Sequence, residues 1–401
     1  MSECRAGWRA GFSSECRAGW RAGFSSECRA GWRAGSTCGD ILDSHVAFAL
    51  PSSFWPTVYR LARGREWPPE SDEDAEALLD RVVPEGLLSL LIAEAELPPP
   101  VSRAIGRFRA LDRSNELRMR VFEQSLEMVA HVLEGERIIV FKGTDYAYRL
   151  YPAPHLRPRQ DIDLLVPRAR AAAIFRRLLE SGAKLHFPAG AIARVPSYHE
   201  AVFEVGNATV EIHHSIVQRT RNRVDYDGIW RRARPWKGFD SRLLQFDDAD
   251  ALLAHAINMS SDQFSCPISR HLDVWLLPRE TPDVVPLAVE RAHAWLTRRA
   301  LYGALRQTSR YFPEFRGAAV EEALQALVKR KSRAFLDRRV LPDPWSPRRY
   351  GRAGQLWKKL WLIDDWPHRV GFFAYHLYAS VAGAFLELRA RRNTNRLLSP
   401  S

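Results

Sequence analysis

Cysteine is scarce in most of this sequence. Four of its five cysteines lie within the first forty residues, and Cys266 is the only one in the remaining chain. A single cysteine can form neither a disulfide framework nor a zinc knuckle, so the sequence beyond residue 40 favours a reducing compartment. The start of the chain also lacks the apolar segment of a secretory signal peptide, because Arg and Glu recur every few residues. We therefore expect a cytoplasmic protein that is not secreted.

Lysine is scarce as well, with seven residues among the 59 basic ones, so arginine carries most of the formal net charge of +12. The planar guanidinium group suits phosphate oxygens, and a phosphate-bearing partner would fit this excess. A compositional bias toward Arg and Ala, with charges spread over solvated helix faces, would explain it equally well. The charge alone therefore does not identify a nucleic-acid-binding protein.

The N-terminal segment is a tandem repeat of SECRAGWRAGFS over residues 2–35. Its twelve-residue period is shorter than the units of about 20–50 residues that build solenoids, and it contains no apolar stripe that could drive packing. We expect residues 1–40 to be disordered and dispensable. The alternative is a Trp- and Arg-rich binding tail, or a metal site formed by the N-terminal cysteines.

The rest of the 401-residue chain is long enough for two or three domains of about 100–200 residues. Apolar residues at helical spacing occupy 70–134 and recur after residue 247, whereas short strand-like runs lie between 137 and 216. The pattern predicts an α+β fold, with a small mixed β-sheet core flanked by N- and C-terminal helical regions. The expected regions are 41–135, 136–235, 236–340 and 341–401, the last being a helix pair with a basic tail.

Two aspartates interrupt an otherwise apolar strand, DIDLLV at Asp161–Val166. Residues two apart on a strand share a face, so Asp161 and Asp163 point the same way. Two carboxylates that close repel each other unless a cation lies between them, and Mg²⁺ prefers oxygen ligands. On the later strand TVEIHHSI, Glu211 and His213 share a face. If the two strands are neighbours, Glu211 completes a three-carboxylate cluster, where it could bind a metal or act as a base.

A glycine lies at the predicted strand-to-helix turn VFKGT. Gly143 and Thr144 open the next helix. A glycine at such a turn lets a phosphate approach the backbone N–H groups at the positive end of the helix, and the threonine hydroxyl adds a donor. Followed by Asp-x-Asp on the next strand, this turn predicts a site for nucleotide phosphates.

These residues resemble the motifs of the bacterial uncharacterised nucleotidyltransferase family, within the DNA polymerase β-like superfold. The resemblance rests on Lys142-Gly143, Leu150-Tyr151-Pro152, Arg157, Asp161–Val166 and Val210-Glu211-Ile212-His213. It is strongest over 138–216 and extends over about 48–370. It implies transfer of a nucleoside monophosphate from an NTP to a hydroxyl or phosphate, with two Mg²⁺ ions and release of pyrophosphate.

The resemblance also implies roles for individual residues. These are Asp161, Asp163 and Glu211 as catalytic metal ligands, and Lys142, Gly143, Thr144 and Arg157 as nucleotide contacts. Lys142 and Arg157 could instead be structural, and Arg159 is a weaker candidate than either. His213 would either form hydrogen bonds that orient the metal ligands or be an ordinary strand histidine.

Three features depart from the wider superfamily pattern. Thr144 replaces the usual Ser, the gap from Gly143 to Asp161 is long, and Glu211 replaces the commoner Asp. The extra methylene of Glu moves its oxygen by about 1 Å, and a displacement of that size can cost about 10²-fold in rate. The alternative function is therefore a catalytically weak nucleotide-binding module. The flanking helices carry no motif that identifies the acceptor as a small molecule, a protein or RNA.

The stretch 370–386 contains seventeen residues without a formal charge and precedes the basic run 389–392. A bilayer-spanning helix needs about 20 apolar residues, and this stretch includes His, Ser and Tyr. We expect a packed or interfacial helix. The third hypothesis is a membrane-surface assembly protein that contacts the bilayer through 370–392 and in which Asp-x-Asp is vestigial.

Overall fold

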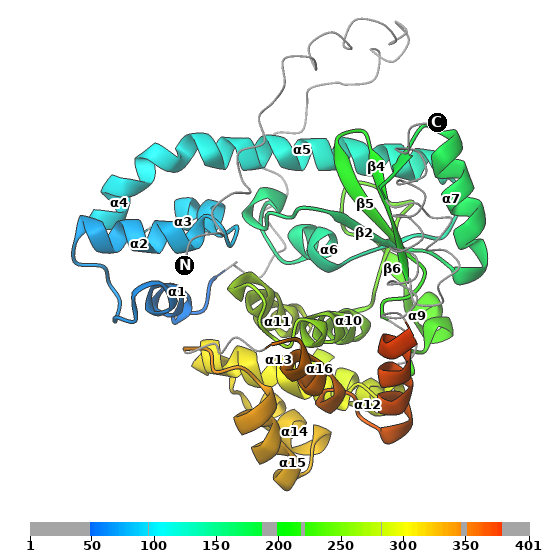
Figure 1. Cartoon of the computed structure of the whole chain (residues 1–401). Coiled ribbons are helices and arrows are strands. Elements are labelled where there is room, and N and C mark those ends of the chain that lie inside the picture. The colour runs from blue at the N-terminus through cyan, green and yellow to red at the C-terminus, as the bar shows by residue number, and fades with distance from the viewer. Residues whose placement is uncertain are drawn as a thin grey trace, which may run out of the picture. The chain divides into compact units, whose positions relative to one another are not determined.

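The computed structural model describes residues 49–94, 96–186, 199–217, 221–281, 283–345 and 351–378. The predicted N-terminal tail 1–40 and the basic run 389–392 lie outside the described residues. Helices precede and follow a mixed β-sheet in the described part of the chain (Figure 1), which confirms the predicted α+β arrangement.

Helices occupy most of the described residues before the sheet. They are α1 (Phe54–Arg63), α2 (Asp72–Val82), α3 (Leu88–Ala93), α4 (Pro99–Ile105) and α5 (Arg109–Val132), with a 3-10 turn at Gly106–Phe108. α2 begins after Ser71, whose hydroxyl accepts a hydrogen bond from the backbone N–H of Asp74. Gly135 has a φ of +84°, a conformation that glycine adopts without strain, and it turns the chain from α5 into the first strand.

The described residues form a seven-stranded sheet in the order β3-β4-β5-β2-β1-β7-β6. The strands are β1 (Ile139–Phe141), β2 (Ile162–Leu165), β3 (Lys184–Leu185), β4 (Glu200–Val205), β5 (Ala208–His213), β6 (Arg234–Pro235) and β7 (Leu244–Gln245). β2 pairs in parallel with β5 and β1 in parallel with β7, and the remaining pairs are antiparallel. The short strands β3, β6 and β7 carry too few residues to show an alternating pattern.

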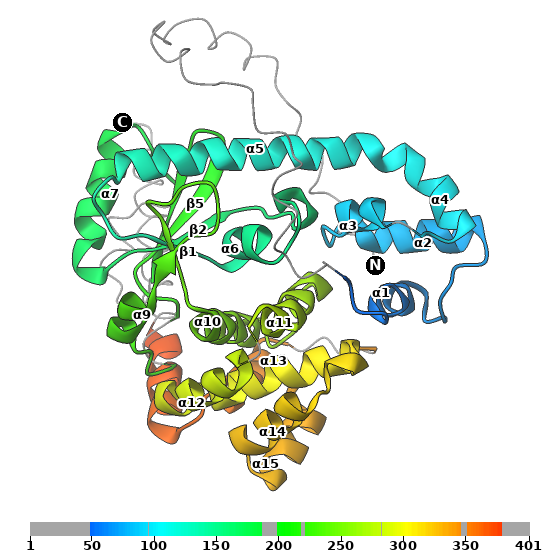
Figure 2. The same cartoon turned by 180° about the vertical axis from the view of Figure 1, so that it is seen from behind.

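The two faces of the sheet pack against different helices. Ile162 and Leu164 of β2 share a hydrophobic cluster with Phe122 of α5 and Ile174 of α7 (Ala171–Glu180). Leu165 belongs to the cluster that contains the buried apolar residues of α10 (Asp248–Ser261). This alternation follows from the two-residue period of a strand, and Figures 1 and 2 show α5 and α10 on opposite sides of the sheet. Asp163 therefore faces away from α5, as its spacing predicts.

Helices also make up most of the described residues after β5. They are α9 (Tyr226–Arg232), α10 (Asp248–Ser261), α11 (Ile268–Glu280), α12 (Val284–Trp295), α13 (Arg298–Tyr311), α14 (Ala318–Leu327), α15 (Arg330–Phe335) and α16 (Arg352–Trp361), followed by helical residues 366–378. One cluster of buried side chains joins α1, the sheet and these helices, including Phe54, Phe141, Leu252 and Phe312. The predicted regions thus contribute side chains to one core, and their bounds stay a prediction from the sequence.

None of the helices in the described ranges is long and apolar enough to cross a membrane. The described part of the stretch 370–386 ends at residue 378.

Candidate active site

The sheet brings two of the three predicted carboxylates side by side. Asp163 of β2 is the register partner of Glu211 in the parallel strand β5. On the other side of β2, Asp163 is the register partner of Phe141, the last residue of β1. Lys142 therefore enters the site from the start of α6 (Lys142–Arg149). Three elements that are far apart in sequence meet at one place on the sheet.

Lys142 and His213 supply positive or proton-bearing groups to this cluster. The Lys142 Nζ lies 2.5 Å from Asp163 Oδ1 and 3.8 Å from Glu211 Oε2. The His213 Nε2 lies 2.9 Å from the same Asp163 oxygen and 3.3 Å from Glu211 Oε2. The side chains of Asp163 and His213 are almost completely buried. The resemblance suggested a nucleotide contact for Lys142, with a structural role as the alternative, and here its ammonium group pairs with the carboxylates.

The backbone of Lys142 is strained. Its φ is +54°, in the left-handed region that residues other than glycine rarely occupy. Such a conformation costs on the order of 1–3 kcal/mol and persists where the surroundings enforce it. Here Lys142 directly follows β1 and begins α6, so the turn directs its side chain toward Asp163.

Asp161 lies just before β2 and has a different electrostatic environment. Burial, and then the negative charges of Asp163 and Glu211, raise the pKa of Asp161 to about 6. Within the described part of the chain Asp161 forms no ion pair with a basic side chain. Ionising it costs folding free energy as the pH rises from about 4 through about 6. A bound divalent cation would remove that cost.

Asp163 is ionised at all ordinary pH values. Burial would raise the pKa of its carboxyl, but the charge of Lys142 and the hydrogen bond with His213 outweigh burial and hold the pKa at about 2. Burial and the Lys142 charge oppose protonation of His213, yet its contacts with Asp163 and Glu211 outweigh them and raise its pKa. Lys142 and His213 thus pair with Asp163, whereas among the described residues Asp161 has no ion-pair partner and feels their charges only from farther away.

The predicted phosphate-binding turn lies at the N-terminus of α6. An added Cβ at Gly143 would meet only the Arg159 Cβ, at the ordinary contact distance of 3.7 Å, so close packing does not require a glycine here. Thr144 is buried, and its hydroxyl donates to the backbone oxygen of Asp161 at 3.4 Å. This bond ties the start of α6 to the start of β2. The N–H groups in the first turn of an α-helix have no partner within the helix, so the start of α6 is suited to an anion.

α6 is anchored from the opposite side. The Tyr146 hydroxyl donates to the backbone oxygen of Ala251 at 2.9 Å, and the Arg149 Nη1 donates to Asp248 Oδ1 at 2.9 Å. Arg149 also pairs with Asp145 within the helix. These buried contacts fix α6 against α10 and so fix the position of Lys142 and Gly143.

Arg157, implied to contact the nucleotide, forms a buried ion pair. Its Nε and Nη2 donate to the two oxygens of Asp273 on α11 at 3.1 and 2.8 Å. The Tyr151 hydroxyl donates to the same carboxylate at 2.9 Å. The side chain of Arg157 thus joins the loop before β2 to α11. Arg159 is also buried, and its guanidinium group lies over the rings of Phe122 and Tyr148.

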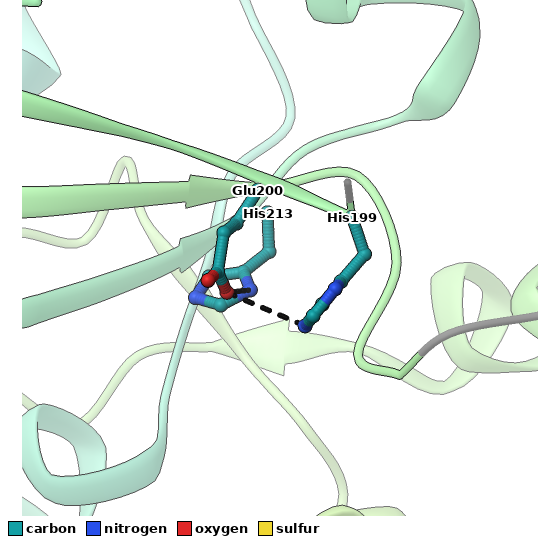
Figure 3. A group of neighbouring side chains, drawn as sticks. All are labelled: His199, Glu200 and His213. Atoms are coloured by element: carbon teal, nitrogen blue, oxygen red, sulfur yellow. Dashed lines mark ion pairs between the residues drawn. The ribbon is translucent and has the colours of Figure 1, made fainter. Parts of the chain in front are cut away.

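Sequence reasoning did not identify Glu200 and His199 as members of this site. Glu200 opens β4 and is the register partner of His213 in β5. Its Oε2 lies 3.1 Å from His213 Nδ1 and 3.3 Å from His199 Nε2 (Figure 3). The strand signal AVFEV starts one residue later, and only the register places Glu200 opposite His213.

The described residues contain two groups of potential metal ligands, and the two groups share His213. One contains Asp163, Glu211 and His213, and the other His199, Glu200 and His213. Carboxylate oxygens such as those of Asp163 and Glu211, with Asp161 nearby, are the ligands that Mg²⁺ prefers. The first group therefore has the donors that the predicted magnesium site needs.

Comparisons with known proteins address the family of the chain. No curated protein sequence matches it. Two solved structures are similar at 10% sequence identity: a crystal structure of ANT(2")-Ia in complex with adenylyl-2"-tobramycin and a solution structure of the antibiotic-resistance factor ANT(2'')-Ia. The first has a TM-score of 0.31 and covers 43% of this chain and 97% of that one. The second has a TM-score of 0.32 and covers 49% and 99%.

A family model described as uncharacterised nucleotidyltransferase matches residues 71–313. The matched range includes α2 to α13 and therefore the sheet, α6 and every residue of the carboxylate cluster. This chain belongs to the family of uncharacterised nucleotidyltransferases.

Proposed function

We propose that this chain transfers a nucleoside monophosphate from an NTP to an acceptor in an Mg²⁺-dependent reaction. The observation that carries the proposal is the pairing of Asp163 with Glu211 on adjacent parallel strands, beside the N-terminus of α6. Asp161 precedes Asp163 by two residues and carries a repulsive charge that a cation would neutralise. Nucleotidyl transfer needs carboxylates that bind metal and donors that bind phosphate. Asp163 and Glu211 would serve as the carboxylates, and the N-terminus of α6 would supply the donors.

In this mechanism the acceptor oxygen attacks the α-phosphorus of the NTP. The bond between the α-phosphorus and the bridging oxygen breaks, and pyrophosphate leaves with the bonding electron pair. Asp161, Asp163 and Glu211 would hold two Mg²⁺ ions, which supply charge stabilisation for the phosphates and the acceptor oxygen. Gly143 and Thr144 would present backbone N–H groups to the β- and γ-phosphates. Glu211 would accept the acceptor proton directly or through a water molecule.

The Glu-for-Asp exchange at 211 fits a ligand role. Its Oε2 reaches within 3.3 Å of His213 Nε2, next to Asp163. The longer side chain therefore still reaches the cluster. The alternative, a weak nucleotide-binding module, predicts that the NTP binds without turnover. Pyrophosphate release in the presence of an acceptor distinguishes the enzyme from the binding module.

The proposal is tested by calorimetric titration of each NTP into the full chain, with Mg²⁺ and with EDTA. We expect binding that requires Mg²⁺ and that strengthens as the pH rises above 6, because Asp161, with a pKa of about 6, must be ionised to bind metal. Pyrophosphate release on adding acceptors from the three classes would then identify turnover. Failure of every NTP to bind in the presence of Mg²⁺ would contradict the proposal.

We also propose that the C-terminal region contacts an anionic membrane surface from the cytoplasm. Trp366, Val370, Phe373 and Leu377 recur at helical spacing on residues 366–378 and are 71%, 50%, 51% and 60% exposed. Four arginines follow within 389–396. An apolar face with aromatic side chains, next to basic residues, suits an anionic bilayer.

Flotation with vesicles tests this contact. We expect the full chain to float with vesicles rich in phosphatidylglycerol and not with phosphatidylcholine alone, because basic residues strengthen binding only at an anionic surface. Phe373→Glu with Leu377→Glu should abolish flotation. Leu117→Glu on α5, where Leu117 is 62% exposed, is the matched control. Equal flotation of the double variant and the wild type would contradict the proposal. It would also be contradicted if the wild type formed a dimer that the double variant dissociates, because the apolar face would then bind a second copy of the chain.

A further inference from the structure

His213 uses its two ring nitrogens differently. Nε2 faces the carboxylates of the proposed magnesium site, at 2.9 Å from Asp163 Oδ1. Nδ1 points to Glu200 and lies 3.1 Å from its Oε2. The geometry nevertheless gives Nδ1 no hydrogen-bond partner among the described residues, although the side chain is 1% exposed. A buried ring nitrogen without a hydrogen bond is uncommon, and a cation shared with Glu200 would give Nδ1 a ligand role.

Glu200 directs the same oxygen toward a second histidine. Its Oε2 lies 3.3 Å from His199 Nε2 and 3.1 Å from His213 Nδ1. Figure 3 shows these three side chains converging from the start of β4 and the end of β5. All three ligand atoms lie within 4.8 Å of one another. The register pair Glu200–His213 fixes two of them on adjacent strands.

The two spacings measured from Glu200 Oε2 are close to those around a tetrahedral ion. Zn²⁺ binds His nitrogen and carboxylate oxygen at about 2.0–2.2 Å, so neighbouring ligand atoms in a tetrahedron lie about 3.3–3.5 Å apart. The two distances from Glu200 Oε2, 3.1 and 3.3 Å, are at or just below that range. Two histidines and one carboxylate leave the fourth position open to water or substrate.

We propose that His199, Glu200 and His213 form a Zn²⁺-class metal site, separate from the magnesium site of Asp161, Asp163 and Glu211. The donor sets differ in the way that separates the two ions. Imidazole nitrogens favour Zn²⁺ and related transition metals, whereas carboxylate oxygens favour Mg²⁺. The proposal does not depend on which acceptor or nucleotide the chain uses.

The two sites are joined through the His213 ring. When Nδ1 binds the metal, the ring proton stays on Nε2, which donates to Asp163 at 2.9 Å. A carboxylate that accepts from a metal-bound histidine orients the ring and strengthens the ligand. The metal would in turn fix the His213 tautomer, so that Asp163 Oδ1 always receives a proton donor. We therefore assign the Zn²⁺-class site a positioning role toward Asp163.

The charges around His213 can accommodate more than one cation. The negative charges of Asp163 and Glu211 act on both Asp161 and Glu200, and the Lys142 ammonium group pairs with Asp163 and Glu211. Two carboxylates contact the His213 ring from the Nε2 side and one from the Nδ1 side. Cations on both sides of the ring would reduce the repulsion between these carboxylates, which the Lys142 ammonium group offsets only in part.

The test uses the full chain, stripped of metal, with Cys4, Cys16, Cys28 and Cys38 changed to serine so that thiolates cannot bind zinc. Zn²⁺ is titrated by calorimetry in excess Mg²⁺, and Co²⁺ is titrated while its visible absorption is recorded. We expect one equivalent to bind with the intense bands of tetrahedral Co²⁺. His199→Ala and Glu200→Gln should each weaken Zn²⁺ binding by about 100-fold or more, since even supporting residues contribute 10–100-fold.

Two control variants separate this site from its neighbours. Asp161→Asn should leave Zn²⁺ affinity unchanged while impairing Mg²⁺-dependent NTP binding. His186→Ala removes an exposed histidine close to Glu204 and should have no effect on zinc. Circular dichroism of each variant confirms folding. The proposal is overturned if Zn²⁺ does not bind in excess Mg²⁺, if His199→Ala leaves binding unchanged, or if Asp161→Asn alone removes it. None of these outcomes bears on Mg²⁺–NTP binding, which the NTP titration measures independently.

Discussion

Changing Asp163 to Asn is expected to abolish nucleotidyl transfer while the fold survives. Asn keeps the shape of the side chain but cannot supply the negative charge that two metal ions would share. It also loses the charged contacts with Lys142 and His213, at 2.5 and 2.9 Å. Losing one charge-stabilising group in an active site typically costs about 10²–10³-fold in rate, and we expect at least that loss. Pyrophosphate release from the NTP that binds measures it.

The matched control is Asp227→Asn, the same chemical change at an exposed position in the first turn of α9. It should leave nucleotidyl transfer unchanged.

The Asp163→Asn variant should also lose a pH-dependent part of its folding stability. The folded pKa of about 2 lies below the ordinary value of 3.8, so ionised Asp163 stabilises the wild type above pH 4, and this contribution disappears as the pH falls toward 2. Retained transfer by a folded Asp163→Asn protein would exclude Asp163 as a metal ligand.

The period of two along a strand was enough to predict that Asp161 and Asp163 share a face. It was not enough to predict their neighbours. The cluster with Glu211 was conditional on β5 lying beside β2, and the parallel register confirms that condition. Glu200 could not be found in this way, because its place opposite His213 depends on the pairing of β4 with β5. Strand faces are local properties, whereas the composition of a site depends on strand pairing.

The basic residues show the same limit more strongly. Arg157 and Asp273 are 116 positions apart, and no spacing rule links them. The positive φ of Lys142 is likewise set by the turn between β1 and α6 and leaves no sequence signal. Motif resemblance treats a lysine or arginine beside a glycine turn as a phosphate contact. Whether its charge is already neutralised depends on the carboxylates that the fold places within reach.

Changing Lys142 to Met is expected to strengthen metal binding and to lower the free energy of unfolding of the metal-free protein. The Lys142 ammonium lies where a cation would contact Asp163 and Glu211, at 2.5 and 3.8 Å. Burial opposes its charge, but Asp163 and Glu211 outweigh burial and raise its pKa, so the group stays charged and competes with Mg²⁺. Removing it should tighten Mg²⁺ or Mn²⁺ binding by about tenfold or more, which is about 1.4 kcal/mol per tenfold.

Without metal, the same variant leaves Asp163 buried with His213 as its remaining close partner in the cluster. We expect a loss of about 1–3 kcal/mol in unfolding free energy in EDTA, and recovery when Mn²⁺ is added. Thermal unfolding and calorimetry measure the two effects. Lys184→Met is the matched control, because the Lys184 side chain is 77% exposed and pairs only with Glu204 among the described residues.

The Lys142 variant also distinguishes the two roles that this residue can have. If Lys142 contacts the triphosphate, as the resemblance implies, Lys142→Met weakens NTP binding and leaves metal affinity unchanged. If it is the resident counter-ion, metal affinity rises and metal-free stability falls. Lys142→Gly adds a further discrimination, because glycine removes the charge and also relieves the strain of a φ of +54°. A glycine variant that is more stable than the methionine variant in EDTA would show that the fold accepts a strained backbone to place an ammonium group on Asp163.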